Sequence, residues 1–201
     1  KILDNIPTIF PDSGKLTPVI SGFTWFQGWN DGSDLNKTAA YEQNLVHLIQ
    51  DVREEWNSPR LPVSIAVSGF DGYTDYRPQP PDCFSDSADK LHCDCGPKDH
   101  GCRRTNIVVS QFAAANLTRH PELECCVVAM ETRGFWREAK YSPKQRQGYH
   151  FNHNAESHYR IGEALAKGIK LASSKSSDGA VDYIRNATNI DLSVSRNNTS
   201  S

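Results

Sequence analysis

Short apolar runs punctuate the chain at three places. Residues 20–26 are rich in β-branched and aromatic side chains, and residues 61–67 and 125–130 are almost continuously apolar. Runs of this length and composition are typical of strands, and continuous apolar character indicates burial on both faces of a sheet. The pattern therefore predicts three strands, at least two of them fully buried.

Three longer segments place their apolar residues at helical spacing. These segments, at about residues 38–56, 106–117 and 155–171, predict amphipathic helices. Asn154 is suited to cap the last of them. The apolar stripes of the first and last helices consist of Leu45, Leu48, Ile49, Val52 and Trp56, and of Ile161, Leu165 and Ile169.

The resulting order is strand, helix, strand, long loop, helix, strand, helix. Strands that alternate with helices need crossover connections, which predict an α/β fold with three α/β/α layers around a parallel sheet. A doubly wound sheet usually has about five or six strands, so three strands indicate that the sheet is incomplete in this chain. We expect one domain over residues 1–171, with a Cys-rich insertion at about 77–104, and a polar tail over residues 172–201.

Composition and charge exclude two classes of function. Lys and Arg number 22 against 24 Asp and Glu, a net charge of −2, which gives no support to nucleic-acid binding. No run of ~18 apolar residues is present, so we expect no membrane span. The hydrophobic share is 37%, which is low for a globular domain and indicates a polar tail or a fold that something outside this chain completes.

The six cysteines indicate that covalent cross-links or a metal stabilise part of the chain. Four lie in a Pro/Asp/Gly-rich stretch that cannot build a packed core, so disulfides or a metal must hold it. Zinc is the rival interpretation because His92 and His100 lie among the thiols, but the spacing lacks paired CxxC knuckles. Cys125 and Cys126 stand at the head of a predicted strand, where alternation favours different partners. The disulfide candidates are Cys83, Cys93, Cys95, Cys102, Cys125 and Cys126.

Asn-X-Ser/Thr triplets agree with an oxidising compartment. Together with the cysteines they predict a secreted, extracellular glycoprotein, with a lysosomal location as the alternative. The candidate glycosylation sites are Asn36, Asn116, Asn186, Asn197 and Asn198.

Two polar clusters occupy the positions where parallel sheets place their sites, beyond the carboxyl ends of strands. Residues 27–31 follow the first strand, and residues 149–153 precede the last helix. A glycine N–H and an asparagine amide can together hold a developing oxyanion, and a histidine can act as general base. A nucleophile is missing, because Ser68 lacks the Gly-x-Ser-x-Gly pattern of a nucleophile turn.

These segments carry a resemblance to a known family. GFTWFQGWND, followed by a helix with Tyr41, Leu45, Ile49, Asp51 and Arg53, resembles the third conserved block of the SGNH/GDSL esterases. The nearest branch is that of the sialate O-acetylesterase-like carbohydrate esterases. GYHFNHNAESHYRIGEALAKGI resembles the closing block of the same branch. The resemblance implies a fold of the SGNH/flavodoxin-like type, of which this chain is the C-terminal half.

The resemblance also implies roles for individual residues. Gly28 and Asn30 match the oxyanion hole, Gln27 matches a residue that lines the site, and His150 matches the general base. The family's nucleophilic serine belongs to a Gly-x-Ser block after the first strand of the sheet, which this chain lacks. Many members have an aspartate where this chain has Gln147, which leaves Asp31 as a weak candidate for the orienting acid.

Two hypotheses follow. In the first, the protein is a serine hydrolase that removes acetyl esters from carbohydrates without a cofactor or metal, once an N-terminal half or a partner chain completes the sheet. In the second, a catalytically inactive SGNH fold acts as a secreted glycoprotein in surface assembly or carbohydrate binding.

Simpler interpretations of the same residues stay open. Asn30 and Asp31 suit a turn before a helix, and His150 can be a structural histidine, with His153 or His158 as the relevant imidazole. Aromatic residues beside the first cluster suit core packing better than sugar stacking. These aromatic residues are Trp25, Phe26 and Trp29.

Overall fold

The computed structural model describes residues 5–13, 18–73, 94–96 and 98–174. The sequons at Asn186, Asn197 and Asn198, together with His92, Cys83 and Cys93, lie outside this part of the chain. The helices and strands are α1 (Ile6–Ile9), β1 (Phe23–Trp25), α2 (Leu35–Glu55), β2 (Val63–Ala66), α3 (His100–Ala114), β3 (Val127–Met130) and α4 (Ala155–Ser174). Short 3-10 turns are Pro11–Ser13, Asp31–Ser33, Pro121–Leu123, Arg133–Phe135, Ala139–Tyr141 and Gly148–His153.

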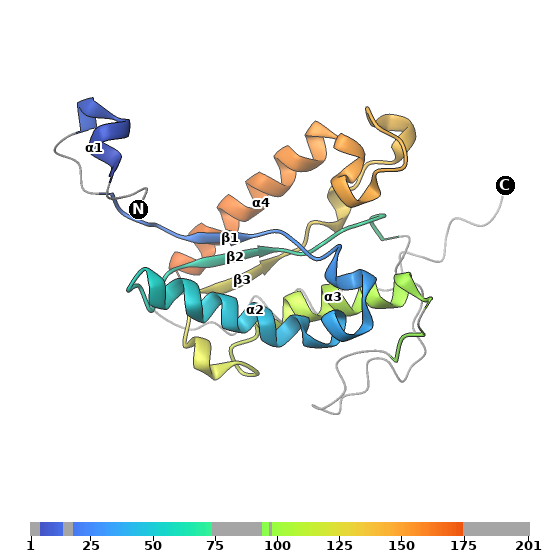
Figure 1. Ribbon diagram of the computed structural model, residues 1–201, viewed down its shortest axis with the longest axis horizontal. Helices are drawn as coiled ribbons and strands as arrows, with labels where there is room; N and C mark the ends of the chain where they lie inside the picture. Colours follow the sequence, from blue (N-terminus) through green and yellow to red (C-terminus); the bar gives the residue numbers. More distant parts are fainter. Residues whose placement is uncertain (1–4, 14–17, 74–93, 97, 175–201) are drawn as a thin grey trace.

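The strands form a parallel sheet in the order β1-β2-β3. Helix α4 covers one face of the sheet, while α2 and α3 lie side by side on the other, which gives three layers (Figure 1). Short α1 stands apart from these layers. The predicted α/β class, element order and small parallel sheet are thus confirmed. Among the described helices, none combines the length and apolar character that a membrane span requires.

The core lies mainly between the sheet and the pair α2 and α3. β2 is buried along its whole length, as its unbroken apolar character predicts. Leu45 and Ile49 of the α2 stripe are buried against it, whereas Trp56, at the helix end, is 39% exposed. The spacing of the apolar residues therefore identified the buried face of α2 correctly, but it did not show that the last residue of the stripe is partly exposed.

Capping side chains set where the helices begin. Asp34 accepts a hydrogen bond from Lys37 N at 2.9 Å, so α2 starts at Leu35 rather than near residue 38. Asp99 does the same for Cys102 N at 3.0 Å, so α3 starts at His100 rather than near residue 106. The predicted cap of α4 is confirmed, because Asn154 Oδ1 accepts from Ser157 N at 3.1 Å.

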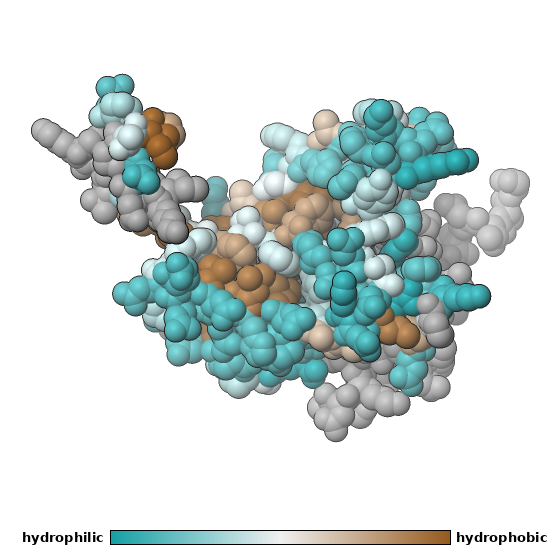
Figure 2. Space-filling model, viewed as in Figure 1, coloured by the Kyte–Doolittle hydropathy of each residue, from teal (hydrophilic) through white to brown (hydrophobic). Residues whose placement is uncertain are grey.

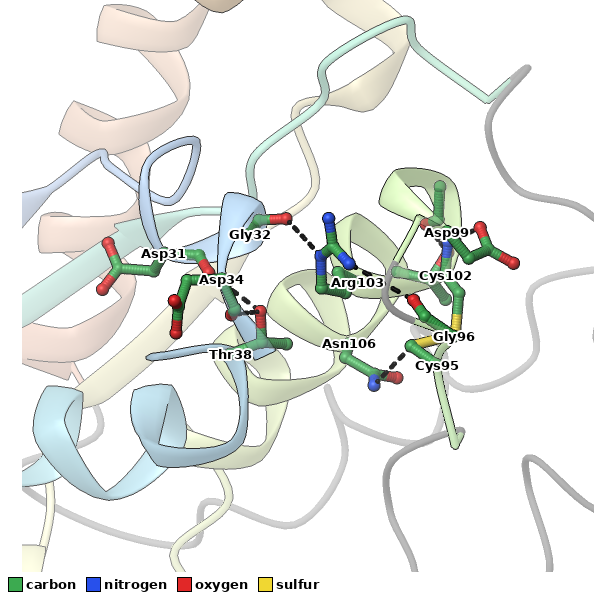
Figure 3. The surroundings of a disulfide bond; sticks show 12 residues. Asp31, Gly32, Asp34, Thr38, Cys95, Gly96, Asp99, Cys102, Arg103 and Asn106 are labelled. Carbon is green, nitrogen blue, oxygen red and sulfur yellow. Dashed lines mark hydrogen bonds between the residues drawn. A yellow bond between two sulfur atoms is a disulfide. The ribbon is translucent and has the colours of Figure 1, made fainter. Parts of the chain in front are cut away.

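The end of the Cys-rich segment is consequently helical. Cys102 lies in the first turn of α3 and pairs with Cys95, which staples the preceding chain to the helix (Figure 3). These two thiols are therefore not zinc ligands. The described residues hold no cluster of three or more His, Cys, Asp or Glu side chains arranged for a metal ion.

The expectation for the adjacent cysteines was wrong. Cys125 and Cys126 form a disulfide with each other. The alternation argument fails because β3 begins only at Val127, so neither cysteine belongs to the strand. Cys126 also has a left-handed backbone, with φ at 68°, which removes the alternation of a strand.

One edge of β1 is open in the described part of the chain. β1 pairs with β2 alone, and its aromatic residues Phe23 and Trp25 are only partly buried. Figure 2 shows apolar surface gathered in a band between α2 and α4, over β1. An interior-like surface at an unpaired edge agrees with the prediction that the sheet is incomplete.

Candidate active site

The first polar cluster follows β1 at the carboxyl edge of the sheet. Gln27 and Gly28 lie in the connection, and Asp31 begins a 3-10 turn that leads into α2. Gly28 is buried at a close approach, since a Cβ there would lie 2.7 Å from both Ile107 Cγ2 and Ser68 Oγ. Only glycine allows the loop to pack this tightly against α3 and the end of β2.

A buried polar network lies under this loop. The Gln27 carbonyl accepts hydrogen bonds from Tyr41 Oη at 2.7 Å, Gln111 Nε2 at 2.8 Å and Ser68 Oγ at 3.2 Å. Tyr41, Ser68 and Gln111 are all at most 4% exposed. The Ser68 hydroxyl is thus engaged in holding the loop, which removes it as a candidate nucleophile.

Asn30 is exposed at the position before the 3-10 turn. Its backbone carbonyl accepts from Ser33 Oγ at 2.6 Å, but its side chain makes no capping hydrogen bond. The capping of α2 is performed by Asp34 instead. The carboxamide of Asn30 therefore does not perform the helix-capping role that is common for asparagine at such a position.

Asp31 is engaged within its own loop. Its Oδ2 accepts from Gln27 Nε2 at 2.5 Å, which orients the Gln27 side chain along the loop. No described hydrogen bond or ion pair joins Asp31 to His150. The geometry thus ties Asp31 to Gln27 and gives no support for a role as orienting acid.

The segment behind this loop is held by a buried arginine. Arg103, 2% exposed, donates through Nε to Gly32 O at 3.2 Å and through Nη1 to Gly96 O at 3.3 Å (Figure 3). Gly96 adjoins the disulfide-bonded Cys95. The disulfide and Arg103 together connect the Cys-rich segment to the turn that follows Asn30.

The second cluster forms an irregular turn before α4. Phe151, Asn152 and His153 all have positive φ, between 50° and 57°. Such conformations are unfavourable for side chains larger than glycine and are found where the surroundings enforce them. Here the buried Asn152 enforces the turn, because its N–H donates to Gln147 O at 3.0 Å and its Oδ1 accepts from Gln147 N at 3.3 Å.

Aromatic side chains bring the two clusters together. The ring centroids of Trp29 and Tyr149 lie 5.7 Å apart, and those of Phe26 and Phe151 lie 5.4 Å apart. Trp29 also packs edge-on against Phe70, at 4.9 Å. Phe26 and Trp29 are partly buried and pack against core residues, as expected for core packing, and these contacts place residues 27–31 beside residues 148–153.

His150 lies on the surface of this junction. Its ring stands 4.5 Å from the Tyr149 ring and 5.7 Å, edge to face, from the His153 ring, measured between centroids. No described carboxylate accepts a hydrogen bond from the His150 imidazole. His150 therefore has the exposure that a proton carrier needs, without an orienting acid among the described residues.

Sequence reasoning missed Gln111 and Asn152. Gln111 lies on the buried face of α3, so a fully polar side chain at a core position of that helix was the available signal. Asn152 gave no such signal, because asparagine is ordinary in a loop.

Two of the predicted glycosylation sites can be located. Asn36 is exposed in the first turn of α2, and Asn116 is half-buried after α3, where its Oδ1 accepts from Thr118 N at 3.0 Å. Glycosylation modifies the nitrogen of the side chain, so this bond does not occupy the atom concerned.

Comparison with known proteins finds a similarity in the part of the chain that carries the first loop. Residues 11–76 match the family model described as carbohydrate esterase, sialic acid-specific acetylesterase. A probable carbohydrate esterase of Arabidopsis thaliana is 32% identical over 65 residues, which are 32% of this chain and 25% of that protein. The chain thus spans about a quarter of the length of the relative it matches. No solved structure matches the chain. Residues 11–76, which contain β1, the loop of Gln27–Asp31, α2 and β2, are therefore similar to the carbohydrate esterase family of sialic acid-specific acetylesterases.

Proposed function

We propose that the protein is a carbohydrate O-acetylesterase of the serine hydrolase type, whose nucleophile lies outside this chain. The observation that carries the proposal is the junction of the two loops. The loop with Gly28 and Asn30 and the loop with His150 are far apart in sequence, and the Trp29–Tyr149 contact brings them side by side. The family match of residues 11–76 supports the same reaction class.

The proposed reaction proceeds in two acyl transfers. A serine hydroxyl attacks the acetyl carbonyl while His150 takes its proton, and the Gly28 N–H and the Asn30 amide hold the oxyanion. His150 then protonates the departing sugar oxygen, which leaves an acetyl-serine. Water attacks this ester with His150 as base again, and acetate leaves while the serine regains its proton. Acetylated carbohydrate is the proposed substrate, and the scheme uses no metal or organic cofactor.

The open edge of β1 is the proposed place for the missing segment. A parallel strand laid along this edge would end at the carboxyl side of the sheet, next to Gln27–Asp31. A serine directly after such a strand would then lie near Gly28 and Asn30. The half-buried aromatic residues Phe23 and Trp25 would become buried, as expected of a strand inside a sheet.

Secretion is part of the proposal. The disulfides Cys95–Cys102 and Cys125–Cys126 and the exposed sequon at Asn36 favour an extracellular protein with N-linked glycans, or a lysosomal one.

A second candidate function is an inactive member of the fold. Gln147 stands where many relatives have an aspartate, and His150 lacks an acidic partner among the described residues. On this hypothesis the protein is a secreted glycoprotein that acts in surface assembly or carbohydrate binding.

Fluorophosphonate labelling of the native, unreduced protein separates the two. The adduct is mapped by mass spectrometry, with the His150→Gln variant as control. We expect an adduct on a serine outside residues 1–201 that is lost in the variant. An adduct on Ser68 would keep the reaction class and overturn the site. No adduct on a folded protein would favour the inactive glycoprotein.

A further inference from the structure

The Gln27 carbonyl receives an unusual number of donors. Tyr41, Gln111 and Ser68 all place a donor atom between 2.7 and 3.2 Å from this oxygen. A carbonyl oxygen has two lone pairs, and most backbone carbonyls receive one donor. Buried polar side chains from α2, α3 and the end of β2 therefore converge on a single peptide group.

The direction of this carbonyl fixes the direction of the next N–H. The described chain contains no cis peptide bond, so the Gln27 C=O and the Gly28 N–H point in opposite directions across one plane. The carbonyl points into the network, and the N–H consequently points away from it. No described group accepts a hydrogen bond from the Gly28 N–H, which is the state that an oxyanion donor requires before substrate binds.

The donors are themselves held in place. Gln111 Oε1 accepts from Ser68 N at 2.8 Å, which fixes the amide so that its Nε2 faces Gln27. The Tyr41 hydroxyl accepts from Trp25 Nε1 at 3.2 Å and is left to donate to Gln27. Burial raises the pKa of Tyr41 to about 12, with the nearby charge of Asp31 acting in the same direction, so this hydroxyl keeps its proton at physiological pH.

We propose that Tyr41 and Gln111, with Ser68, are positioning residues for catalysis: they orient the Gln27–Gly28 peptide and polarise it, so that the Gly28 N–H is a stronger oxyanion donor. Hydrogen bonds to a carbonyl withdraw electron density from the peptide group and strengthen donation by its N–H. This inference rests on the proposed esterase function, and it assigns to a buried network a role in rate as well as in stability.

Isotope labelling allows the Gln27–Gly28 peptide to be observed directly by NMR. Incorporation of ¹³C-carbonyl Gln and ¹⁵N-Gly labels two Gln-Gly pairs within residues 1–201, Gln27–Gly28 and Gln147–Gly148, because this sequence contains no other Gln-Gly step. In the full-length protein, Tyr41→Phe should move the Gln27 carbonyl resonance upfield and leave that of Gln147 in place. Ser68→Ala should cause a smaller shift in the same direction, and it is the milder variant should Tyr41→Phe not fold. An unmoved Gln27 resonance in a folded variant would overturn the inference.

Steady-state kinetics on an acetylated sugar give the second readout. Tyr41→Phe should lower kcat by about 10-fold to about 10²-fold at nearly unchanged KM, because only the oxyanion contact is weakened. Glu42→Gln, a buried change on the same helix that touches neither loop, should leave kcat unchanged in the folded protein. An active Tyr41→Phe enzyme with wild-type kcat would refute the positioning role. An inactive wild-type protein would instead refute the proposed function, while the carbonyl shift would still show whether the network polarises the peptide.

Discussion

Asn30 illustrates how residue type and residue role can differ. It stands before a 3-10 turn, where asparagine commonly caps, yet Asp34 caps α2 and the Asn30 side chain makes no capping bond. We predict that Asn30→Ala lowers kcat by about 10²–10³-fold, the usual effect of removing an oxyanion donor. Asn44→Ala, an exposed change on α2, is the matched control. Unchanged turnover in Asn30→Ala would remove Asn30 from the site.

His150 and His153 provide a second residue-scale comparison. Both are exposed, and their rings meet edge to face at 5.7 Å between centroids. We predict that His150→Gln abolishes ester hydrolysis and that His153→Gln retains most of it, since the family resemblance assigns the base to His150 alone. Rates measured over a range of pH test the assignment. The reverse outcome would transfer the role of general base to His153.

At the scale of elements, the sequence predicted the three strands and the three long helices of the described residues, because their apolar patterns are strong. The predicted helix boundaries were wrong where a polar capping side chain determines the first residue of the helix. Asp34 and Asp99 start α2 and α3 earlier than the apolar stripes do. The prediction for Cys125 and Cys126 failed because the strand begins at Val127, two residues after the start of its apolar run.

Arg53 joins α2 to the start of two strands. This buried side chain donates to the carbonyls of Leu61, Leu123 and Cys125, at 2.7–3.2 Å. We predict that Arg53→Met lowers the free energy of unfolding by about 3 kcal/mol, because buried carbonyls lose their charged donor. Arg160→Met, which breaks an exposed pair with Glu156, should lower it by less than about 1 kcal/mol. Chemical denaturation of both variants measures the difference, and equal effects would contradict it.

Glu42 of α2 makes interactions whose contribution to stability depends on pH. Burial alone would raise its pKa, but hydrogen bonds and charge from Arg119 and His120 outweigh burial and hold the pKa below its ordinary value of 4.5. A lowered carboxylate pKa stabilises the fold above the unfolded-state value, and this stabilisation is lost as the pH falls through the folded-state value.

We therefore predict that unfolding free energy falls with acid below about pH 4.5 and that Glu42→Gln makes this fall shallower while lowering stability at neutral pH. Denaturant titrations across this range test the prediction. Glu163→Gln, at an exposed position of α4, is the control and should keep the wild-type slope. A wild-type slope in Glu42→Gln would show that other groups dominate.

At the scale of the molecule, the sequence located both loops of the candidate site but not the residues that hold them in place. Their meeting depends on the packing of Trp29 with Tyr149, and the orientation of the first loop depends on Gln111, which lies 84 residues from Gln27. Contacts of this range leave no local pattern in the sequence. The short sheet and the missing Gly-x-Ser block agree with each other, and the prediction of a nucleophile outside this chain rests on both.

The open edge of β1 yields a prediction about completion of the whole sheet. Phe23 N donates to Pro62 O at 2.8 Å, so Phe23 faces β2, and in a parallel strand the backbone groups of the next residue, Thr24, face the other edge. In this chain alone the Thr24 amide should exchange rapidly with solvent, and in the full-length protein an added strand should protect it. The Phe23 amide should be protected in both and is the internal reference. Equally fast exchange of Thr24 in the full-length protein would mean that no strand pairs with this edge, and the nucleophile would then have to reach Asn30 from another direction.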